Sequence, residues 1–261
     1  MSDQVDAAAD AVADAGIPAP PWQRLPERPA RRRREPISRE AIVEAAVRVL
    51  DRDGLDALSM RRVADELGTG AASLYWHVGS KDGLLDLVFD YVIGEQQVPA
   101  PDPAHWQEQI KDVARSQRAI CLRHPYVVQI SIGRIPMGPN ALRYSERVLA
   151  ILRGGGVPDL LAVQGYLLLI SAVNGFMLDE TGDAGESESA AGAGEPGAAG
   201  PGAQEMADMA SAYLASLPAE RFPNMVALAG EFSMADPGER FELLLDIFVG
   251  GIERRAAASS S

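Results

Sequence analysis

The chain has 261 residues, of which 47% are apolar and 23% charged; this is ordinary for a globular protein and excludes fibrous and wholly disordered classes. Its formal net charge of −13 argues against nucleic-acid binding until the charge is mapped along the chain. Residues 24–39 hold seven arginines and two acids, whereas residues 84–261 hold 12 basic and 23 acidic side chains. A single cysteine, Cys121, excludes an internal disulfide and is typical of a reducing compartment.

The first segment, residues 1–36, is rich in Ala, Pro, Asp and Arg and lacks an amphipathic pattern, which predicts a mobile arm. Acidic residues stand where a secretory signal carries positive charge, so a cytoplasmic protein is expected. The arm ends in a basic run formed by Arg31, Arg32, Arg33 and Arg34. These arginines can follow the negative potential of a minor groove, or they can be a solvated tail.

Serine caps then mark a series of helices. Ser38 precedes an apolar pattern with helical spacing that stops at Gly54, and Ser59 opens a short helix that Gly68 closes. A third short helix follows from about Ala71 to Val78, and Ser80 caps a fourth. Two short helices joined through Gly68–Gly70, with a supporting helix before them, are the geometry that delivers a helix end into the major groove.

The remainder of the chain shows helical patterns broken by Pro and Gly. Helices are expected near 103–123, 125–132, 140–153, 159–179, 204–217 and 237–254. The apolar stretch from Tyr166 to Leu178 is too short for a membrane span and predicts a core helix, so no membrane partner is expected. Residues 181–203 lack large apolar side chains and are rich in glycine, which predicts a disordered loop.

The string from Ile42 through Leu85 resembles the DNA-binding domain of the TetR family of bacterial regulators. The letters LYWHV at residues 74–78, followed by Lys81, resemble the tetracycline-repressor subgroup. The resemblance implies an all-α fold with a three-helix helix-turn-helix DNA-binding head over residues 37–83. It also implies a helical ligand-binding and dimerisation body over residues 84–255, and hence a homodimer that binds double-stranded operator DNA and a small-molecule effector.

Carried over residue by residue, the resemblance places the recognition helix on Gly70–His77. Two alanines can contact only thymine methyl groups, so specificity is expected to depend on Arg61, Ser73 and DNA shape. Tyr75 and Trp76 can instead be packing residues, and His77 can make a local hydrogen bond. The DNA contacts that the resemblance implies are Ser59, Arg61, Gly70, Ala71, Ala72, Ser73, Tyr75, Trp76, His77 and Lys81.

A ligand-gated regulator needs a mostly apolar cavity with a few convergent polar groups. Met, Tyr and Asn side chains after Trp106 suit a bulky, flat, partly polar molecule, although each can equally be a core residue. Met137 stands where the subgroup carries its magnesium-binding histidine, so neither a metal-chelated effector nor a cofactor is expected. The predicted ligand-binding residues are Tyr126, Gln129, Met137, Asn140, Tyr144, Arg147, Tyr166, Asn174, Met177, Phe222 and Met225.

The two most apolar late helices are expected to pair with those of a second copy in a four-helix interface. Such a two-fold dimer predicts a pseudo-palindromic operator. The predicted interface residues are Leu168, Leu169, Ala172, Phe176, Phe241, Leu244, Leu245 and Phe248.

These patterns predict a repressor that a small hydrophobic effector, a natural product or antibiotic, releases from DNA. One alternative is a DNA-binding regulator that answers to a protein partner, which a body without an internal pocket would favour. An enzyme is the other alternative, but no nucleophile, metal or cofactor pattern supports it: His77, His105, His124 and Cys121 share no zinc spacing.

Overall fold

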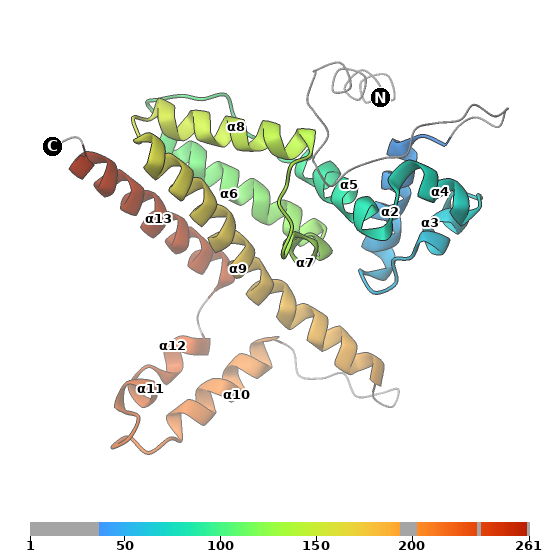
Figure 1. The fold of residues 1–261 in the computed structure, drawn as a ribbon. Helices are drawn as coiled ribbons and strands as arrows, with labels where there is room; N and C mark the ends of the chain where they lie inside the picture. The colour runs from blue at the N-terminus through green and yellow to red at the C-terminus, as the bar shows by residue number, and fades with distance from the viewer. Residues whose placement is uncertain (1–36, 194–202, 234–235, 260–261) are drawn as a thin grey trace. The chain divides into compact units, whose positions relative to one another are not determined.

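The computed structural model describes residues 37–193, 203–233 and 236–259, and within these ranges the regular elements are α-helices (Figure 1). The basic run at Arg31–Arg34 lies outside the described residues. The chain divides into two compact units, one ending at Tyr166 and one beginning at Leu167. The helices of the first unit are α2 (Arg39–Asp53), α3 (Met60–Glu66), α4 (Ala71–Val78), α5 (Lys81–Ile93), α6 (Trp106–Arg123), α7 (Tyr126–Ser131) and α8 (Pro139–Gly154).

Serine caps start three of the first four helices, as predicted. The Oγ atoms of Ser38, Ser59 and Ser80 accept backbone N–H bonds of 3.1, 3.2 and 2.9 Å. After α3 the chain turns at Gly68, whose φ of +61° is a conformation that costs glycine little. The turn therefore fixes where α4 begins.

The core of the head is one apolar cluster. Ile42, Val63, Leu74 and Val88 are fully buried in it and come from α2, α3, α4 and α5 in turn. Burying a large aliphatic side chain contributes roughly 1.5–3 kcal/mol, so a few such residues hold four short helices together. The cluster extends to Ile120, Tyr126 and Ile130, because α5 packs on the helices that follow it as well as on α2. The first compact unit thus continues past residue 83, the predicted end of the head.

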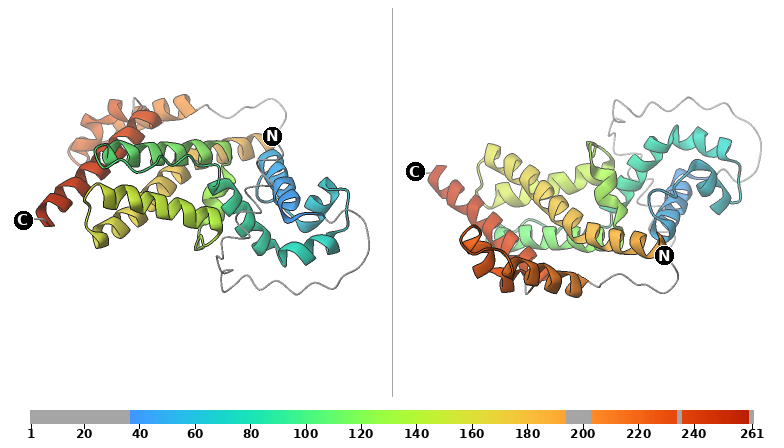
Figure 2. Two further views of the ribbon diagram at one scale, coloured as in Figure 1. Left: turned by 90° about the horizontal axis from the view of Figure 1, so that it is seen from above. Right: turned by 90° about the horizontal axis from the view of Figure 1, so that it is seen from below.

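Helix α9 (Asp159–Ala193) begins in the first unit and continues into the second (Figures 1 and 2). It runs 13 residues into the segment 181–203 that the sequence predicts to be a loop, so the loop prediction is wrong for residues 181–193. Once a helix is nucleated, each added residue costs little, and the Ala and Glu residues here are good helix formers. Residues 194–202 lie outside the described ranges.

The second unit also contains α10 (Ala203–Ala215), α11 (Pro223–Ala227), α12 (Ala229–Ser233) and α13 (Pro237–Ser259). The sequence predicts α10 and α13 but misses α11 and α12, which have five residues each and show no period. Within this unit the ring of Phe176 on α9 lies 5.1 Å from that of Phe241 on α13, edge to face. Arg240 on α13 lies over Phe176 and pairs with Asp179 at 2.8 Å.

The segment Asp159–Glu180 of α9 is not a buried core helix, in contrast to the prediction. By length and composition it would suit a membrane span, and only 28% of its most apolar window is buried. Leu167 and Leu168 are 57% and 59% exposed, while Leu169, one residue on, is buried. The helix thus has an inner face and an apolar outer face.

Candidate functional site

The recognition helix α4 is anchored on one side and open on the other. Leu74 and Val78 are buried in the head, while Tyr75 and Trp76 are 48% and 45% exposed. Leucine at 74 therefore takes the packing role, which leaves both aromatics available to a partner. Of the remaining predicted DNA contacts, Ala72, Arg61, Ser59, Gly70 and Lys81 are exposed and Ala71, Ser73 and His77 half-buried.

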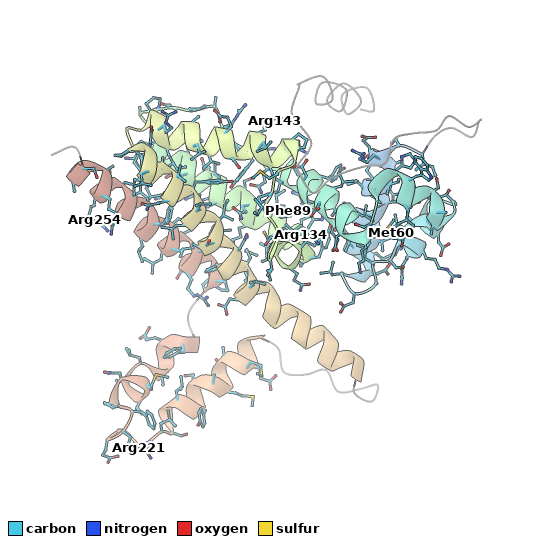
Figure 3. The ribbon with its side chains drawn as sticks, in the orientation of Figure 1. Met60, Phe89, Arg134, Arg143, Arg221 and Arg254 are labelled. Carbon is cyan, nitrogen blue, oxygen red and sulfur yellow. The ribbon has the colours of Figure 1, made fainter. Side chains whose placement is uncertain are left out.

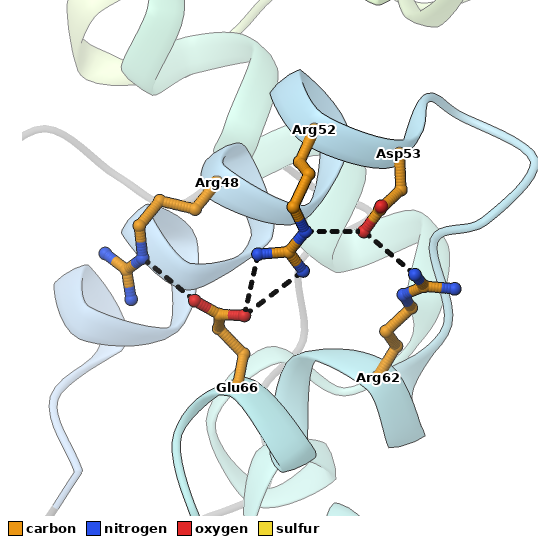
Figure 4. Close-up of polar contacts among 5 residues, drawn as sticks. All are labelled: Arg48, Arg52, Asp53, Arg62 and Glu66. Carbon is orange, nitrogen blue, oxygen red and sulfur yellow. Dashed lines mark hydrogen bonds and ion pairs between the residues drawn. The ribbon is translucent and has the colours of Figure 1, made fainter.

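A network of ion pairs braces α3 against α2 (Figure 4). Glu66 accepts from Arg48 at 3.3 Å and from Arg52 at 3.2 Å, and Asp53 pairs with both Arg52 and Arg62 at 3.0 Å. The hydrogen bonds from Arg48 and Arg52 hold the pKa of Glu66 below its ordinary value. Because the network is solvent-exposed, it orients the two helices more than it stabilises them. By contrast, the one ion pair of Arg61 within the described residues is with Asp65, at 4.0 Å, and the Arg61 side chain is 89% exposed.

Helix α5 is tied at two points to the part of the chain that follows it, once to the segment between α7 and α8 and once to the start of α8. Arg134, labelled in Figure 3, pairs with Asp82 at 3.1 Å and also with Asp86. The Asp90 carboxylate accepts the backbone N–H groups of Asn140 and Ala141 at 3.3 and 2.9 Å, and so caps α8. Burial raises the pKa of Asp90, and the two N–H bonds oppose that rise.

Gly138 permits this approach, because a Cβ atom at that position would collide with the carboxyl group of Asp90. Lys81 is the first residue of α5, and the head packs on this helix, so the orientation of α5 sets the orientation of both. These contacts therefore fix the direction in which the head projects from α7 and α8.

A third tie runs through a buried histidine at the end of α6. His124 is 4% exposed; its Nδ1 lies 2.6 Å from Asp51 of α2, and its Nε2 lies 3.5 Å from Glu95. The Tyr126 hydroxyl is 3.2 Å from the same Nδ1, and burial, with the charge of Asp51, raises the pKa of Tyr126. Arg123 completes the chain of contacts by pairing with Glu95 at 2.7 Å.

An open pocket of about 930 Å³ lies beside these ties. Its walls come from the end of α5, the linker 94–99, one face of α6 and one face of α8. The Tyr144 side chain is buried in the wall and donates to Gln117 at 3.3 Å, and burial raises the pKa of Tyr144. The lining is mixed in character, with Ile93, Val98, Pro99 and Ile120 beside Gln96, Ser116, Asn140 and several arginines.

The pocket brings together three of the predicted ligand-binding residues, Asn140, Tyr144 and Arg147. The others lie elsewhere. Tyr126 is buried beside His124, Gln129 is exposed, Met137 lines a separate small pocket and Tyr166 bonds to Ser145. In the second unit, Met177 is buried, Asn174 half-buried, and Phe222 and Met225 exposed.

The linker glutamines and Arg115, Arg123 and Arg143 also line the pocket but were not predicted from the sequence. Each is a polar residue on an amphipathic helix or in a loop, so nothing local separates it from an ordinary surface residue. Along α8 the lining residues are spaced three and four apart, at Asn140, Arg143, Tyr144 and Arg147. This spacing can be recognised as a signal only once the pocket is known.

Among the predicted interface residues, Leu169, Phe241 and Leu245 are buried within the single chain and have little surface left for a partner, so their place in the interface stays a prediction. The sequence pattern marks both helices as apolar but does not separate an inward face from an outward one. Leu168 is exposed, and Ala172, Phe176, Leu244 and Phe248 are half-buried.

The helices of the described residues, the exposed short helix α4 and the ligand-sized pocket together define the class of helix-turn-helix regulators. The family models agree: residues 42–88 match "Bacterial regulatory proteins, tetR family" and residues 98–256 match "Tetracyclin repressor-like, C-terminal domain". The chain belongs to the TetR family of transcriptional regulators.

Two curated relatives are transcriptional regulators from actinomycetes. An HTH-type transcriptional regulator of Saccharopolyspora erythraea is 42% identical over 56% of this chain and 62% of its own length. The HTH-type transcriptional repressor DrrR1 of Streptomyces coeruleorubidus is 38% identical over 54% of this chain and 55% of its own. The alignments thus span little more than half of these relatives.

Solved structures cover more of the chain. Apo ActR from Streptomyces coelicolor is 42% identical, with a TM-score of 0.75 over 87% of this chain and 100% of that one. ActR in complex with actinorhodin is 43% identical, with a TM-score of 0.73 over 84% of this chain and 96% of that one. The fold, including its N-terminal helix-turn-helix and helical C-terminal domain, is therefore that of a ligand-binding regulator.

Proposed function

We propose that this chain is a homodimeric repressor that binds a pseudo-palindromic operator through α4 and releases it when a small molecule occupies the pocket between α6 and α8. The observation that carries the proposal is the exposure of Tyr75 and Trp76 on a short helix whose Leu74 is fully buried. Exposing two aromatics costs solvation free energy that contact with DNA recovers. The likeness to DrrR1, a repressor, supports the sign of regulation.

The test is DNA binding by fluorescence anisotropy with duplexes from the region upstream of the gene. We expect Tyr75→Ala and Trp76→Ala to weaken binding roughly 10-fold or more each, as the loss of one good contact of 1–3 kcal/mol implies. Tyr213→Ala, which removes a still more exposed aromatic from α10, is the control. Equal affinities for all three variants would contradict the proposal.

The basic run Arg31–Arg34 is proposed to add affinity from a neighbouring minor groove. The head itself holds six basic and eight acidic side chains over residues 37–83, so it supplies little general attraction to phosphate. Deletion of residues 1–35 is expected to weaken operator binding and flatten its salt dependence. An unchanged slope of log K against log salt would show that the run is a solvated tail.

The second copy is proposed to cover the outer face of α9 and α13. This face exposes Leu167, Leu168, Leu243 and Ile247, the last at 64%. Polar Gln164 and Ser171, also exposed on α9, suit a protein partner better than lipid. Leu168→Glu is expected to give monomers in light scattering, whereas Leu142→Glu, on α8, should leave the dimer intact.

Two of the ties described above give the pocket a route to the head. Arg123 lines the pocket and holds Glu95 beside His124, which in turn meets Asp51 of α2. Asn140 also lines the pocket, and its backbone N–H reaches Asp90 of α5. A ligand that moves either wall acts on a contact of α2 or α5, and so changes the spacing of the two heads.

The pocket supports control by a small molecule over control by a protein partner. A volume of about 930 Å³ lies within the range of small-molecule sites. ActR, a structural neighbour, has been solved with actinorhodin and with (S)-DNPA, which makes natural products the first compounds to screen.

A further inference from the structure

A buried histidine ends α6 at the point where this helix meets α2 of the head and the linker 94–99. The chain has three histidines. The His105 side chain is 73% exposed and His77 is half-buried, whereas His124 is 4% exposed. The His124 ring contacts Asp51 of α2 through Nδ1, at 2.6 Å, and approaches Glu95 of the linker through Nε2, at 3.5 Å. His124 is therefore placed between one carboxylate of the head and one carboxylate beside the pocket.

The protons on the His124 ring can be assigned from its partners. An ionised carboxylate only accepts hydrogen bonds, so Nδ1 carries a proton that it donates to Asp51. In a neutral ring, Nε2 is then a bare acceptor that faces the Glu95 carboxylate, and it is buried without a hydrogen-bond partner among the described residues. A second proton turns Nε2 into a donor. Both nitrogens of the resulting imidazolium then have an acidic partner.

Two tyrosines lie near these groups on the neighbouring helices. The ring of Tyr126 on α7 is 5.7 Å from that of His124, and the Tyr126 hydroxyl is 3.2 Å from Nδ1. Burial, together with the charge of Asp51, raises the pKa of Tyr126. Burial, together with nearby carboxylates that include Glu95, also raises the pKa of Tyr91 on α5. Both tyrosines therefore stay neutral near pH 7.

The remaining charged groups around the cluster belong to α6 and α2. Arg123 pairs with Glu95 at 2.7 Å and so shares this carboxylate with His124. On α2, Glu44 and Arg48 carry opposite charges and act in opposite directions on the Tyr91 hydroxyl. Imidazole is the one side chain among these types that ordinarily changes its charge between pH 5 and 8. A change of pH near neutrality therefore alters the charge of this cluster through His124.

The second proton acts on a contact between separate segments. Asp51 lies in the last turn of α2, whose buried side chains help to build the core of the head, and Glu95 lies in the linker after α5. When both nitrogens of His124 carry protons, an ion pair joins each segment to the end of α6. When Nε2 loses its proton, its lone pair repels the Glu95 carboxylate, and the attraction to the linker is lost.

We propose that His124 is a proton-sensitive positioning residue: its imidazolium holds α2 and the linker to the end of α6, and loss of one proton releases the linker and weakens operator binding. Operator affinity is then higher in mild acid than in mild base. The inference rests on the proposed function only for this effect on DNA, because the titration of His124 can be followed without DNA.

Magnetic resonance of the full-length chain with ¹³C-labelled histidine follows this proton directly. The three histidines give three ring signals, and the His124 signal is the one that His124→Gln removes. Glu95→Gln takes away the carboxylate that faces Nε2, so we expect the His124 signal to titrate about one pH unit lower in this variant. Asp102→Asn is the matched control, because it removes the carboxylate 2.8 Å from the ring of His105 and should move only the His105 signal.

Fluorescence anisotropy with upstream duplexes, at constant ionic strength, tests the effect on DNA binding. His77 lies in the recognition helix and can add a pH dependence of its own, so the measured quantity is the ratio of affinities at about pH 6 and about pH 8. We expect His124→Gln to lower this ratio about tenfold, the size of one hydrogen bond to a charged group. His105→Gln should leave the ratio unchanged.

Thermal unfolding identifies a His124→Gln chain that has lost its fold. Glu95→Gln keeps the test open in that case, because it retains the histidine and removes only the partner of Nε2. In this variant the pH at which operator affinity falls should move down together with the His124 signal.

The proposal is overturned if the His124 signal titrates at the same pH with and without Glu95, or if His124→Gln keeps the pH dependence of operator binding. A signal that shifts as expected, combined with an operator affinity that is equal at both pH values, overturns the control of DNA binding by this proton. A chain that binds no duplex at any pH contradicts the proposed function instead, and the magnetic resonance titration still decides whether Glu95 holds the proton on His124.

Discussion

The head and the body of this chain are built on different principles. In the head, the buried side chains of α2, α3 and α4 are apolar, and the charged contacts between Arg48, Arg52 and Glu66 lie at the surface. In the helices after α5, Gln117 and His124 are buried polar residues, and an open pocket separates parts of α6 and α8. The head therefore holds one shape, whereas the body contains the polar groups whose partners can change.

The two tasks of a regulator, binding DNA and responding to a ligand, thus fall to regions that are packed in different ways. A dense apolar cluster presents Tyr75 and Trp76 in a fixed frame, because a close-packed core resists small shifts. A buried polar group must keep a hydrogen-bond partner, so the contacts of Gln117 and His124 change only when a new partner is supplied, which suits a site that must respond to a ligand.

The largest effect should come from the centre of the head. Leu74→Ala removes a fully buried leucine and is expected to cost about 2–5 kcal/mol in unfolding free energy. If head and body are as different as proposed, operator binding should disappear while ligand binding in the pocket persists. Leu142→Ala on α8, at a position 37% exposed, should change stability far less. Equal losses in chemical denaturation would contradict this.

The next largest effect should come from a change at His124. Changing it to Asn leaves the Asp51 carboxylate and the Tyr126 hydroxyl with a shorter partner, so we expect a loss of about 1–3 kcal/mol and a weaker response of DNA binding to ligand. His105→Asn is a matched control, because His105 also pairs with an aspartate at 2.8 Å but its side chain is 73% exposed. Urea denaturation and anisotropy measure both effects, and identical behaviour of the two variants would refute the role of His124.

A smaller effect is expected from the ion pairs that brace the head. Glu66→Gln should lower stability by at most about 1 kcal/mol, since exposed pairs contribute little. The loss should shrink in high salt, where screening has already weakened the wild-type pairs. Glu146→Gln, at an exposed site on α8, serves as control. A salt-independent loss would mean that Glu66 acts through packing.

The smallest effect concerns Asp90 and pH. Because burial raises its pKa, the folded chain holds this proton to higher pH than the unfolded chain, whose aspartate titrates near 3.8. Stability from this group is therefore greatest in acid and falls as the pH rises through the raised pKa. Asp90→Asn should remove that part of the slope in urea denaturation between acid and neutral pH. If the slope of unfolding free energy against pH stays unchanged, other titrating groups cause this pH dependence.

The helices of the head could be predicted from the sequence, because their signals are local. Ser38, Ser59 and Ser80 cap the helices that they were expected to cap, and Leu74 faces the core. Each signal lies within a few residues of the structure that it determines. The DNA contacts proposed for Tyr75 and Trp76 remain predictions, although their exposure agrees with them.

The pocket could not be predicted in the same way. Gln96, Arg123 and Arg143 come from three segments that meet only in the folded unit, and each looks like an ordinary surface residue in its own segment. On α9 the pattern showed that the helix is apolar but not which of its faces turns inward, so Leu168 and Leu169 were grouped together. Because both faces of this helix are apolar, no polar stripe sets its register.

The brace formed by Arg48, Arg52, Asp53, Arg62 and Glu66 has a consequence for how operator affinity is measured. Added electrolyte displaces the protein from phosphate and, at the same time, loosens the frame on which α4 is mounted. A plot of log K for operator binding against log salt concentration should therefore steepen at high ionic strength instead of staying straight. Only the slope at low salt concentration then reports the number of phosphate contacts.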